Sequence, residues 1–165
     1  MVIQEKAAFQ FMGDWAKGEF TAAGKRPGKD YFCAAAPGTA DSFTFNVDSF
    51  AMFKLKDANA QQAQIDLAST LMGTQFQEVF NLNKGSIPVR SNTDMSKFDD
   101  CAKLSAKDYT KSAEAGRLLP SVTHGMAIRP SVEGAIKDAV SRFWNDDRIS
   151  VDDGVRNIAR AAATR

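Results

Sequence analysis

Five residues of this sequence have side chains that suit the binding of a polyhydroxylated ligand. Trp15 follows Asp14, and Asn46, Lys84 and His124 come later, each where a helix or strand is expected to end. The flat ring can pack on the C–H face of a sugar, and the polar groups offer hydrogen-bond donors and acceptors to hydroxyls. Their spacing is not that of a metal site or a catalytic triad. We therefore expect a binding protein with no metal, no cofactor and no catalytic residue.

Each of these residues also has a purely structural interpretation. Trp15 can be a core tryptophan, and Asp14 a solvated carboxylate near a helix end. Asn46 can occupy a bulge or turn. Lys84 can offset the dipole at the C-terminal end of a helix. A lone histidine such as His124 is more often structural than functional.

Other polar and aromatic residues are weaker candidates for a binding site or are expected to have structural roles. Gln10 and Ser42 remain minor candidates for a binding cleft, while Lys54 and Arg90 are expected in solvent. Trp144 follows an apolar helix face and is expected to pack in the core. The same expectation applies to most of the phenylalanines of one aromatic stretch, Phe43, Phe45, Phe50 and Phe53.

The bulk composition describes a chain with one core and no strong charge. The 165 residues are 44% hydrophobic, which is enough for a single domain. Lys and Arg number 21 against 20 Asp and Glu, so nothing indicates a nucleic-acid or anionic membrane partner. The apolar runs are too short for a membrane span, and no signal-peptide pattern opens the chain.

The two cysteines, Cys33 and Cys101, leave two possibilities open. With a single histidine in the chain they cannot form a structural zinc site. They can pair as a disulfide in an oxidising compartment, or remain as two buried thiols.

The first half of the chain is expected to hold both helices and strands. Residues 4–17 have helical periodicity, with Trp15 on the apolar face. Short apolar stretches at 31–36 and 43–53 resemble strands. A helix is expected over about 59–72, capped by Gly73, and another from Thr74.

The second half is expected to be helical. Gly85 and Pro88 interrupt the chain after the helix from Thr74. Residues 91–117 are polar and suggest short helices. An amphipathic helix follows Ser131, with Val132, Val140 and Phe143 facing inward. Residues 150–153 resemble a capping box before a final helix. The class is helix-rich α/β, with too few strands for a complete sheet.

Taken in order, several stretches resemble the C-terminal half of extracellular solute-binding proteins of sugar ABC transporters, of the glucose- or mannose-binding type. No single motif is specific for this family, but the order of the motifs along the chain is. The matching stretches are FQFMGDWA (9–16), APGT (36–39), FNVDS (45–49), NKGSIPVR (83–90), THGMA (123–127) and the tail at 150–163.

This resemblance implies a two-lobed, type II-like fold similar to maltose-binding protein, with sugar bound between the lobes. Residues 1–36 would be part of the C-terminal lobe, 37–109 part of the N-terminal lobe with hinge crossings, and 110–165 the rest of the C-terminal lobe. The family's first half, with its signal peptide and further sugar contacts, has no counterpart here. We therefore expect a fragment of that fold.

The resemblance also implies sugar contacts by Asp14, Trp15, Asn46, Lys84 and His124. The ligand would be a monosaccharide such as glucose or mannose, and the partners would be ABC permease subunits. The missing half or a second copy could complete the molecule by dimerisation or segment exchange. The family is periplasmic, although without an export signal this chain would stay cytoplasmic.

Two other functions are weighed against sugar transport. A glycoside hydrolase fragment would need two carboxylates at a defined separation, and Asp14 has no obvious partner in the sequence. A non-binding assembly module could arise from truncation, because a cut through a hinge exposes apolar surface. The favoured hypothesis remains a sugar-binding component that binds weakly or not at all without its other half.

Overall fold

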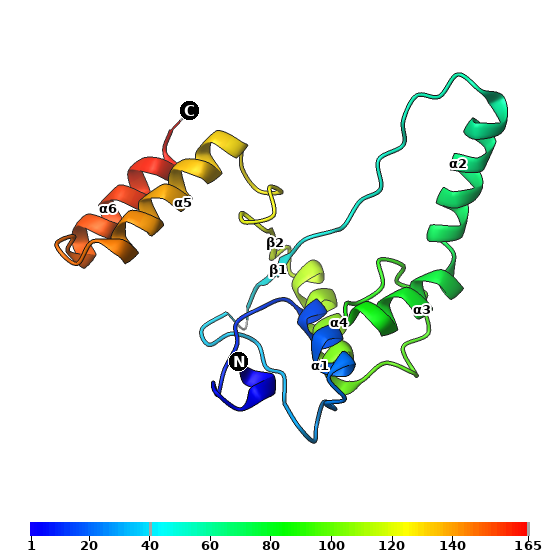
Figure 1. Ribbon diagram of the computed structural model, residues 1–165, viewed down its shortest axis with the longest axis horizontal. Coiled ribbons are helices and arrows are strands. Elements are labelled where there is room, and N and C mark those ends of the chain that lie inside the picture. Colours follow the sequence, from blue (N-terminus) through cyan, green and yellow to red (C-terminus); the bar gives the residue numbers. More distant parts are fainter. Residues whose placement is uncertain (40, 165) are drawn as a thin grey trace. The chain divides into compact units, whose positions relative to one another are not determined.

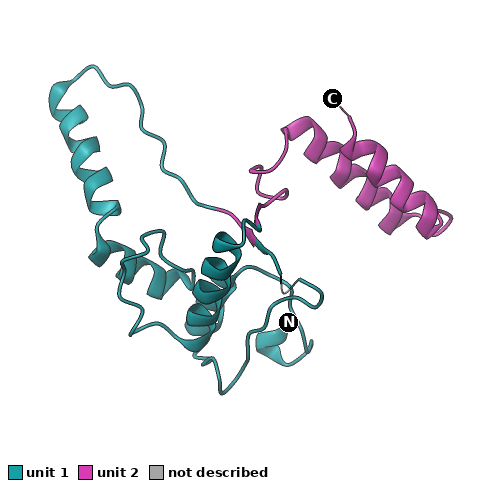
Figure 2. Cartoon of the chain, turned by 180° about the vertical axis from the view of Figure 1, so that it is seen from behind, with its two compact units in different colours: residues 1–43, 47–117 teal, residues 44–46, 118–165 magenta. Residues whose placement is uncertain are grey.

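The computed structural model describes residues 1–39 and 41–164. The chain forms two compact units, drawn in teal and magenta in Figure 2. The first contains residues 1–43 and 47–117, and the second contains residues 44–46 and 118–165. None of the helices in the described part of the chain is long and apolar enough to cross a membrane.

Within the described residues, the first unit contains four α-helices and two short 3₁₀ turns. The α-helices are labelled in Figure 1. The α-helices are α1 (Lys17–Ala22), α2 (Ala58–Leu71), α3 (Thr74–Lys84) and α4 (Asp100–Glu114), and the turns are η1 (Val2–Gln4) and η2 (Asp14–Ala16).

Aspartate caps fix where the two longest helices of this unit begin. The Asp57 carboxylate accepts a hydrogen bond from the Ala60 amide at 2.8 Å, and the Asp99 carboxylate accepts one from the Ala102 amide at 2.8 Å. Such caps satisfy one of the unpaired amides of a first helical turn. Helix α4 is one continuous helix, so the expectation of short helices over 91–117 was wrong.

Two glycines with different roles flank α3. Gly73 is its N-cap, rather than the C-cap of α2 as the sequence suggested; Met72 takes that place. Gly85 is the C-cap and has a φ of 90°, a left-handed conformation that favours glycine.

The first unit has a small core centred on the N-terminal turn of α4. Phe98, Cys101 and Ala102 are buried there, and so is Phe20 of α1. Cys33 forms a disulfide with Cys101 across a sequence separation of 68 residues, which decides between the two possibilities left open by the sequence. The disulfide ties a segment without helix or strand to α4.

The N-terminal end of α1 lies against the C-terminal end of α3. A Cβ atom added to Gly18 would lie 2.7 Å from the carbonyl oxygen of Lys84, and one added to Gly85 would lie 2.7 Å from the Gly18 amide nitrogen. Only residues without a side chain allow this backbone contact, so the two glycines set how α1 and α3 meet.

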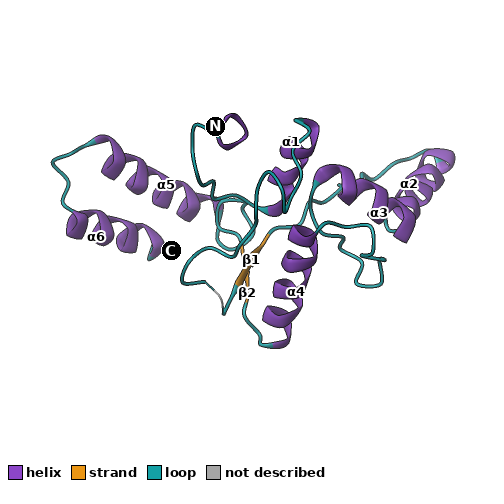
Figure 3. Ribbon diagram, turned by 90° about the horizontal axis from the view of Figure 1, so that it is seen from below, coloured by secondary structure: helices purple, strands orange, loops and turns teal. Residues whose placement is uncertain are grey.

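Two short strands pair in parallel (Figure 3). They are β1 (Phe43–Phe45) and β2 (Leu118–Pro120). The Phe43 amide donates to the Arg117 carbonyl at 3.2 Å, and the Ser121 amide donates to the Phe45 carbonyl at 2.8 Å, so both strands advance in the same direction. Strand β1 is the expected strand at 43–53, but only three residues of it form.

The second unit contains a pair of helices, α5 (Pro130–Asn145) and α6 (Val151–Ala162). Pro130 opens α5, where its missing amide hydrogen costs nothing. The Ser150 hydroxyl accepts a hydrogen bond from the Asp153 amide at 3.1 Å, as the capping box predicted. Gly154 permits close packing, because an added Cβ would lie 2.7 Å from the Phe143 ring.

The predicted helix over 4–17 was wrong. Within that range only Gln4 at the end of η1, the turn η2 and the first residue of α1 are helical, and residues 5–13 have no helix. Phe9, Phe11 and Met12 are exposed. Amphipathic helices form mainly because one face is buried by tertiary packing, and these side chains have no such surface within the described chain.

Two further expectations about apolar residues were wrong. The stretch at 31–36 forms no strand beyond a single bridge residue, Tyr31. Trp144 is 82% exposed instead of lying in the core, and Phe50 and Phe53 are exposed as well. Alternating or helical apolar patterns indicate a face that can be buried, but not which surface buries it.

Candidate functional site

Asp14 is the first residue of η2 and lies half-buried against α4. Its carboxylate accepts a hydrogen bond from the Ser105 hydroxyl at 3.0 Å. Burial raises the pKa of the Asp14 carboxyl above its ordinary value, while the Ser105 hydroxyl and then the Lys17 ammonium lower it by smaller amounts. This is not the solvated carboxylate of the alternative interpretation.

Lys17 fixes the same region through a partly buried ion pair. Its side chain is only 6% exposed, and its ammonium lies 2.9 and 3.1 Å from the two carboxylate oxygens of Asp99. Asp99 is also the N-cap of α4. One carboxylate therefore joins the start of α1 to the start of α4, and Asp14 sits between these two helices.

Trp15 is half-buried, with its ring folded back over Gly13. A Cβ atom added to Gly13 would lie 2.0 Å from the ring, so glycine is required for this placement of the ring. The tryptophan is thus neither a fully buried core residue nor a freely exposed one.

Lys84 is the last residue of α3. Its ammonium forms an ion pair with the Asp48 carboxylate, and it lies 5.6 Å from the centre of the Phe80 ring. Asp48 was not among the residues chosen from the sequence, although it lies in the FNVDS stretch. The contact with Lys84 joins residues 36 apart, and no local pattern could have revealed it.

A shallow hollow lies beside Lys84 on the surface of α3. It has a volume of about 500 Å³ and is lined by Phe76, Val79, Phe80, Asn83 and Lys84. The rings of Phe76 and Phe80 stack with centres 5.3 Å apart and planes inclined by 18°.

Asn46 and His124 belong to the second unit. Asn46 follows β1 and is half-buried. His124 is exposed, and its Nδ1 lies 2.7 Å from the Ser121 hydroxyl and 3.3 Å from the Thr123 hydroxyl. Ser121 is itself buried next to β2, so it holds the imidazole in a defined place.

The structure brings some of the five candidates together. Asp14, Trp15 and Lys84 lie in the first unit, and the Lys84 charge is the smallest of the influences that lower the pKa of Asp14. Asn46 and His124 lie in the second unit. Each set offers the amide, carboxylate, ammonium or imidazole groups that hydroxyls need. Among the described residues, no cluster of three or more His, Cys, Asp or Glu could hold a metal ion.

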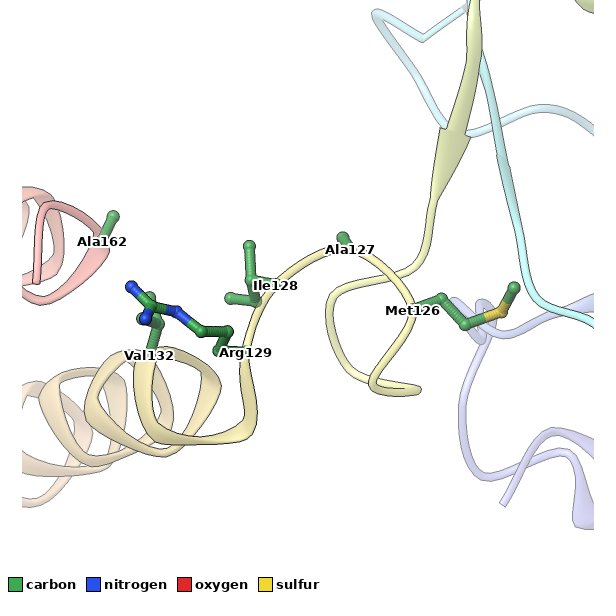
Figure 4. A pocket seen from close by; sticks show the side chains of 6 residues that line it. All are labelled: Met126, Ala127, Ile128, Arg129, Val132 and Ala162. Atoms are coloured by element: carbon green, nitrogen blue, oxygen red, sulfur yellow. The ribbon is translucent and has the colours of Figure 1, made fainter. Parts of the chain in front are cut away.

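A second hollow, of about 490 Å³, lies at the start of α5 (Figure 4). The Arg129 side chain lies beside Val132 and extends toward Ala162 there. None of the five candidates lines this hollow.

Three curated relatives share much of the sequence. A probable sugar-binding periplasmic protein of Brucella suis is 44% identical over 98% of this chain and 38% of its own length. An uncharacterized ABC transporter extracellular-binding protein of Pyrococcus horikoshii is 32% identical over 87% of the chain and 31% of its own. A xylose/arabinose-binding protein of Haloferax volcanii is 29% identical over 84% of the chain and 29% of its own.

These relatives are all named as binding proteins, and none is named as an enzyme. No protein-family model matches the chain. The chain spans less than two fifths of the length of the Brucella relative. Over nearly all of its own length, this protein is a homologue of the sugar-binding periplasmic proteins and of the extracellular-binding proteins of ABC transporters.

Proposed function

We propose that this chain forms part of the sugar-binding component of an ABC-type importer. The observation that carries the proposal is the 44% identity to a sugar-binding periplasmic protein over 98% of the chain. The favoured ligand is a monosaccharide of the glucose or mannose type, from the resemblance of the motifs around Trp15, Lys84 and His124. One relative is named for xylose and arabinose, so pentoses belong in any test.

We propose that Asp14, Trp15, Asn46, Lys84 and His124 contact the sugar. Their chemistry supports this: Trp15 offers an aromatic face, and the others offer donors and acceptors for hydroxyls. Asp48 joins this proposal because its carboxylate pairs with the Lys84 ammonium. An ion pair at the rim of a site can accept and donate hydrogen bonds at once.

The lobe assignment is also a proposal. Residues 1–36 and 110–165 would belong to one lobe of the two-lobed fold, and 37–109 to the other. The two compact units are defined by contacts within this chain. The two lobes, in contrast, refer to a molecule as long as the relatives. The parallel pairing of β1 with β2, 73 or more residues later along the chain, is the kind of crossing that a hinge between lobes needs.

We propose an oxidising, extracytoplasmic location for the protein. The disulfide between Cys33 and Cys101 supports it, because such bonds persist mainly outside the cytosol. The names of the Brucella relative and of the Pyrococcus relative place those proteins in the periplasm and outside the cell, respectively.

The partners would be permease subunits and a polypeptide equivalent to the rest of the relatives' length. Large apolar side chains exposed on both units support the second partner, since they offer surface for further packing. Examples are Phe9, Phe11 and Phe53 in the first unit and Trp144 and Val151 in the second. A second copy of this chain is the alternative occupant, and it would appear as a dimer in sedimentation.

The test is isothermal titration with glucose, mannose, galactose, xylose and arabinose. The chain is titrated by itself and after addition of the polypeptide that corresponds to the first part of the Brucella relative. We expect binding only in the mixture, because part of the site would come from the added polypeptide. Lys84→Met and His124→Ala should then weaken it by about tenfold or more, the effect of removing a charged or polar sugar contact.

Either of two results would contradict the proposal. Tight binding by the chain without addition would show that the site is complete within these residues. Absence of binding in the mixture, with both polypeptides folded and associated, would leave the sequence similarity without the proposed activity.

A further inference from the structure

Two amide side chains of α3, those of Gln77 and Asn81, are buried. They are four residues apart, so they lie one turn from each other on the same face of the helix. A buried amide needs hydrogen-bond partners, because an unpaired polar group in the interior costs free energy. The partners of these two amides therefore show which parts of the chain the pair holds.

Gln77 connects α3 to the chain before the helix and to the chain after it. Its Nε2 donates a hydrogen bond to the carbonyl of Leu71, the last residue of α2, at 2.8 Å. Its Oε1 accepts a hydrogen bond from the Val89 amide at 3.1 Å, so residues 85–89 fold back along α3. One side chain thus fixes both the end of α2 and the segment that follows α3.

Asn81 holds the chain immediately after Lys84. Its carbonyl accepts a hydrogen bond from the Gly85 amide at 2.8 Å, and its Oδ1 accepts one from the Ser86 hydroxyl at 2.8 Å. Its Nδ2 donates to the Gln77 carbonyl at 2.7 Å and lies 3.3 Å from the Gln77 Oε1. The last turn of a helix frays easily, because its final carbonyls lack partners within the helix. These hydrogen bonds therefore fix the turn that carries Lys84.

The contacts of the Lys84 side chain are not enough to fix its ammonium. The side chain of Asp48, its ion-pair partner, is 63% exposed, and Phe80, whose ring lies near the ammonium, is 39% exposed. Exposed ion pairs contribute little to a fixed geometry, because solvent screens them and two side chains must be ordered. The position of the ammonium therefore depends on where the backbone at Lys84 is held.

We propose that Gln77 and Asn81 are positioning residues, which hold the Lys84 ammonium in place by fixing residues 85–89 against α3. The inference rests on the proposed function in one respect, that Lys84 contacts the sugar. A fully paired buried polar network favours one arrangement of the chain over its alternatives. A binding group needs such support, because it must be held within about 0.5 Å of its productive position.

The first experiment is nuclear magnetic resonance of the whole chain without sugar. Gln77→Met replaces the amide with an apolar side chain of similar length. We expect hydrogen exchange of the Val89 amide to become about tenfold faster, because its hydrogen-bond acceptor is lost. The ε-methylene signals of Lys84, which the Phe80 ring shifts, should move toward their positions in an unstructured chain.

Three further variants control for folding and for the substitution itself. Gln75→Met makes the same change at an exposed side chain of the same helix, and it should leave both signals unchanged. Ser86→Ala removes only one hydroxyl, so it tests the network even if Gln77→Met does not fold. It should shift the Lys84 signals in the same direction as Gln77→Met, whereas Ser86→Thr keeps the hydroxyl and should retain the wild-type signals.

The second experiment is isothermal titration of glucose and xylose into the chain mixed with the polypeptide that corresponds to the first part of the Brucella relative. Ser86→Ala should weaken binding about three- to tenfold, the usual effect of losing one hydrogen bond. Added to Lys84→Met, it should cause no further loss, because the network acts through Lys84.

The results separate this inference from the proposed function. Unchanged Lys84 signals in both Gln77→Met and Ser86→Ala would overturn the inference, whether or not exchange of the Val89 amide becomes faster. A full additional loss of affinity when Ser86→Ala is combined with Lys84→Met would overturn it as well. If the wild-type mixture bound no sugar, the proposed function would fail, and the Lys84 signals of the chain without sugar would still decide whether the two amides position the lysine.

Discussion

At the scale of single residues, Asp14 is the group whose behaviour depends most on its surroundings. Burial raises the pKa of its carboxyl, and Ser105 and Lys17 offset part of that shift. Because the folded pKa is higher than the unfolded one, this group contributes full stability below its unfolded pKa. That contribution is lost as the pH rises through the folded pKa. The charged groups that act on it from the neighbouring helices are Lys17 of α1 and Lys84 of α3.

The Ser105→Ala variant tests this account of Asp14. Without the hydroxyl, the ionised carboxylate loses a hydrogen bond, so the pKa of Asp14 should rise further. The pH window in which stability is lost should move upward with it. The measurement is a carboxyl-carbon nuclear magnetic resonance titration of Asp14, together with urea unfolding at several pH values.

Ser112→Ala is the matched control for Ser105→Ala. It makes the same change two turns further along α4, and it should leave the titration of Asp14 where it is. If the pKa of Asp14 stayed the same or fell in Ser105→Ala, the hydrogen bond would not be what stabilises the carboxylate.

Lys17→Met tests the partly buried ion pair between Lys17 and Asp99. The methionine keeps most of the apolar stem but removes the ammonium, which leaves the Asp99 carboxylate without its partner. Loss of one member of a fully buried pair costs about 3–5 kcal/mol, and the Asp99 side chain is 35% exposed, so we expect a loss of about 1–3 kcal/mol in the free energy of unfolding.

Lys25→Met is the comparison for Lys17→Met. Lys25 pairs with Glu5 at 3.8 Å, and the Glu5 side chain is 87% exposed, so its removal should cost less than about 1 kcal/mol. Equal losses in the two variants, measured by urea unfolding, would show that the Lys17 pair contributes no more than a surface contact.

At the scale of secondary-structure elements, the contact between α1 and α3 depends on two glycines. Gly18 and Gly85 bring the backbones together, and Lys84, the candidate sugar contact, is the residue just before Gly85. The position of the Lys84 side chain is therefore coupled to this helix contact. A change that separates the helices should move the ammonium relative to Asp48 and Phe80.

Gly85→Ala should destabilise the protein by at least about 2 kcal/mol, from left-handed strain together with a clash. Its φ is +90°, and the new Cβ would lie 2.7 Å from the Gly18 amide nitrogen and 3.0 Å from the Lys17 Cβ. Gly116→Ala isolates the strain, because its φ is +66° and no atom lies within 4 Å of an added Cβ. It should cost about 1–2 kcal/mol in urea unfolding. If both variants cost the same, the contact between the helices adds nothing.

At the scale of the whole molecule, the disulfide is the longest covalent constraint on the chain. It joins Cys33, in a segment without helix or strand, to the first turn of α4, which also holds the Asp99 cap. A crosslink over 68 residues reduces the conformational freedom of the unfolded chain.

Replacing both cysteines with serine should lower the free energy of unfolding by about 4 kcal/mol, as expected for a loop of this length. Reduction of the wild type should have a similar effect, whereas the double serine variant should be insensitive to reductant. The measurement is urea unfolding with and without dithiothreitol. A wild type that unfolds identically under both conditions would contradict a stabilising role for the bond.

The local patterns of the sequence were sufficient for part of the fold. Helix α2 forms within one residue of the expected bounds, α3 begins at Thr74 as expected, and Ser150 caps α6. These features depend on helical periodicity and on caps within a few residues of the chain, and both are visible in sequence. The resemblance to sugar-binding proteins also followed from short motifs, and the relatives confirm it at that level.

Only the tertiary structure decided the surroundings of the candidate residues. Ser105 lies 91 residues from Asp14, and Asp48 lies 36 residues from Lys84. The exposure of Trp144 and the failure of the helix over 4–17 have the same origin. The sequence determined which side chains could form helices, caps and polar contacts. Which of them meet, and which apolar faces are buried, depends on contacts between distant segments, and these leave no periodic signal in one sequence.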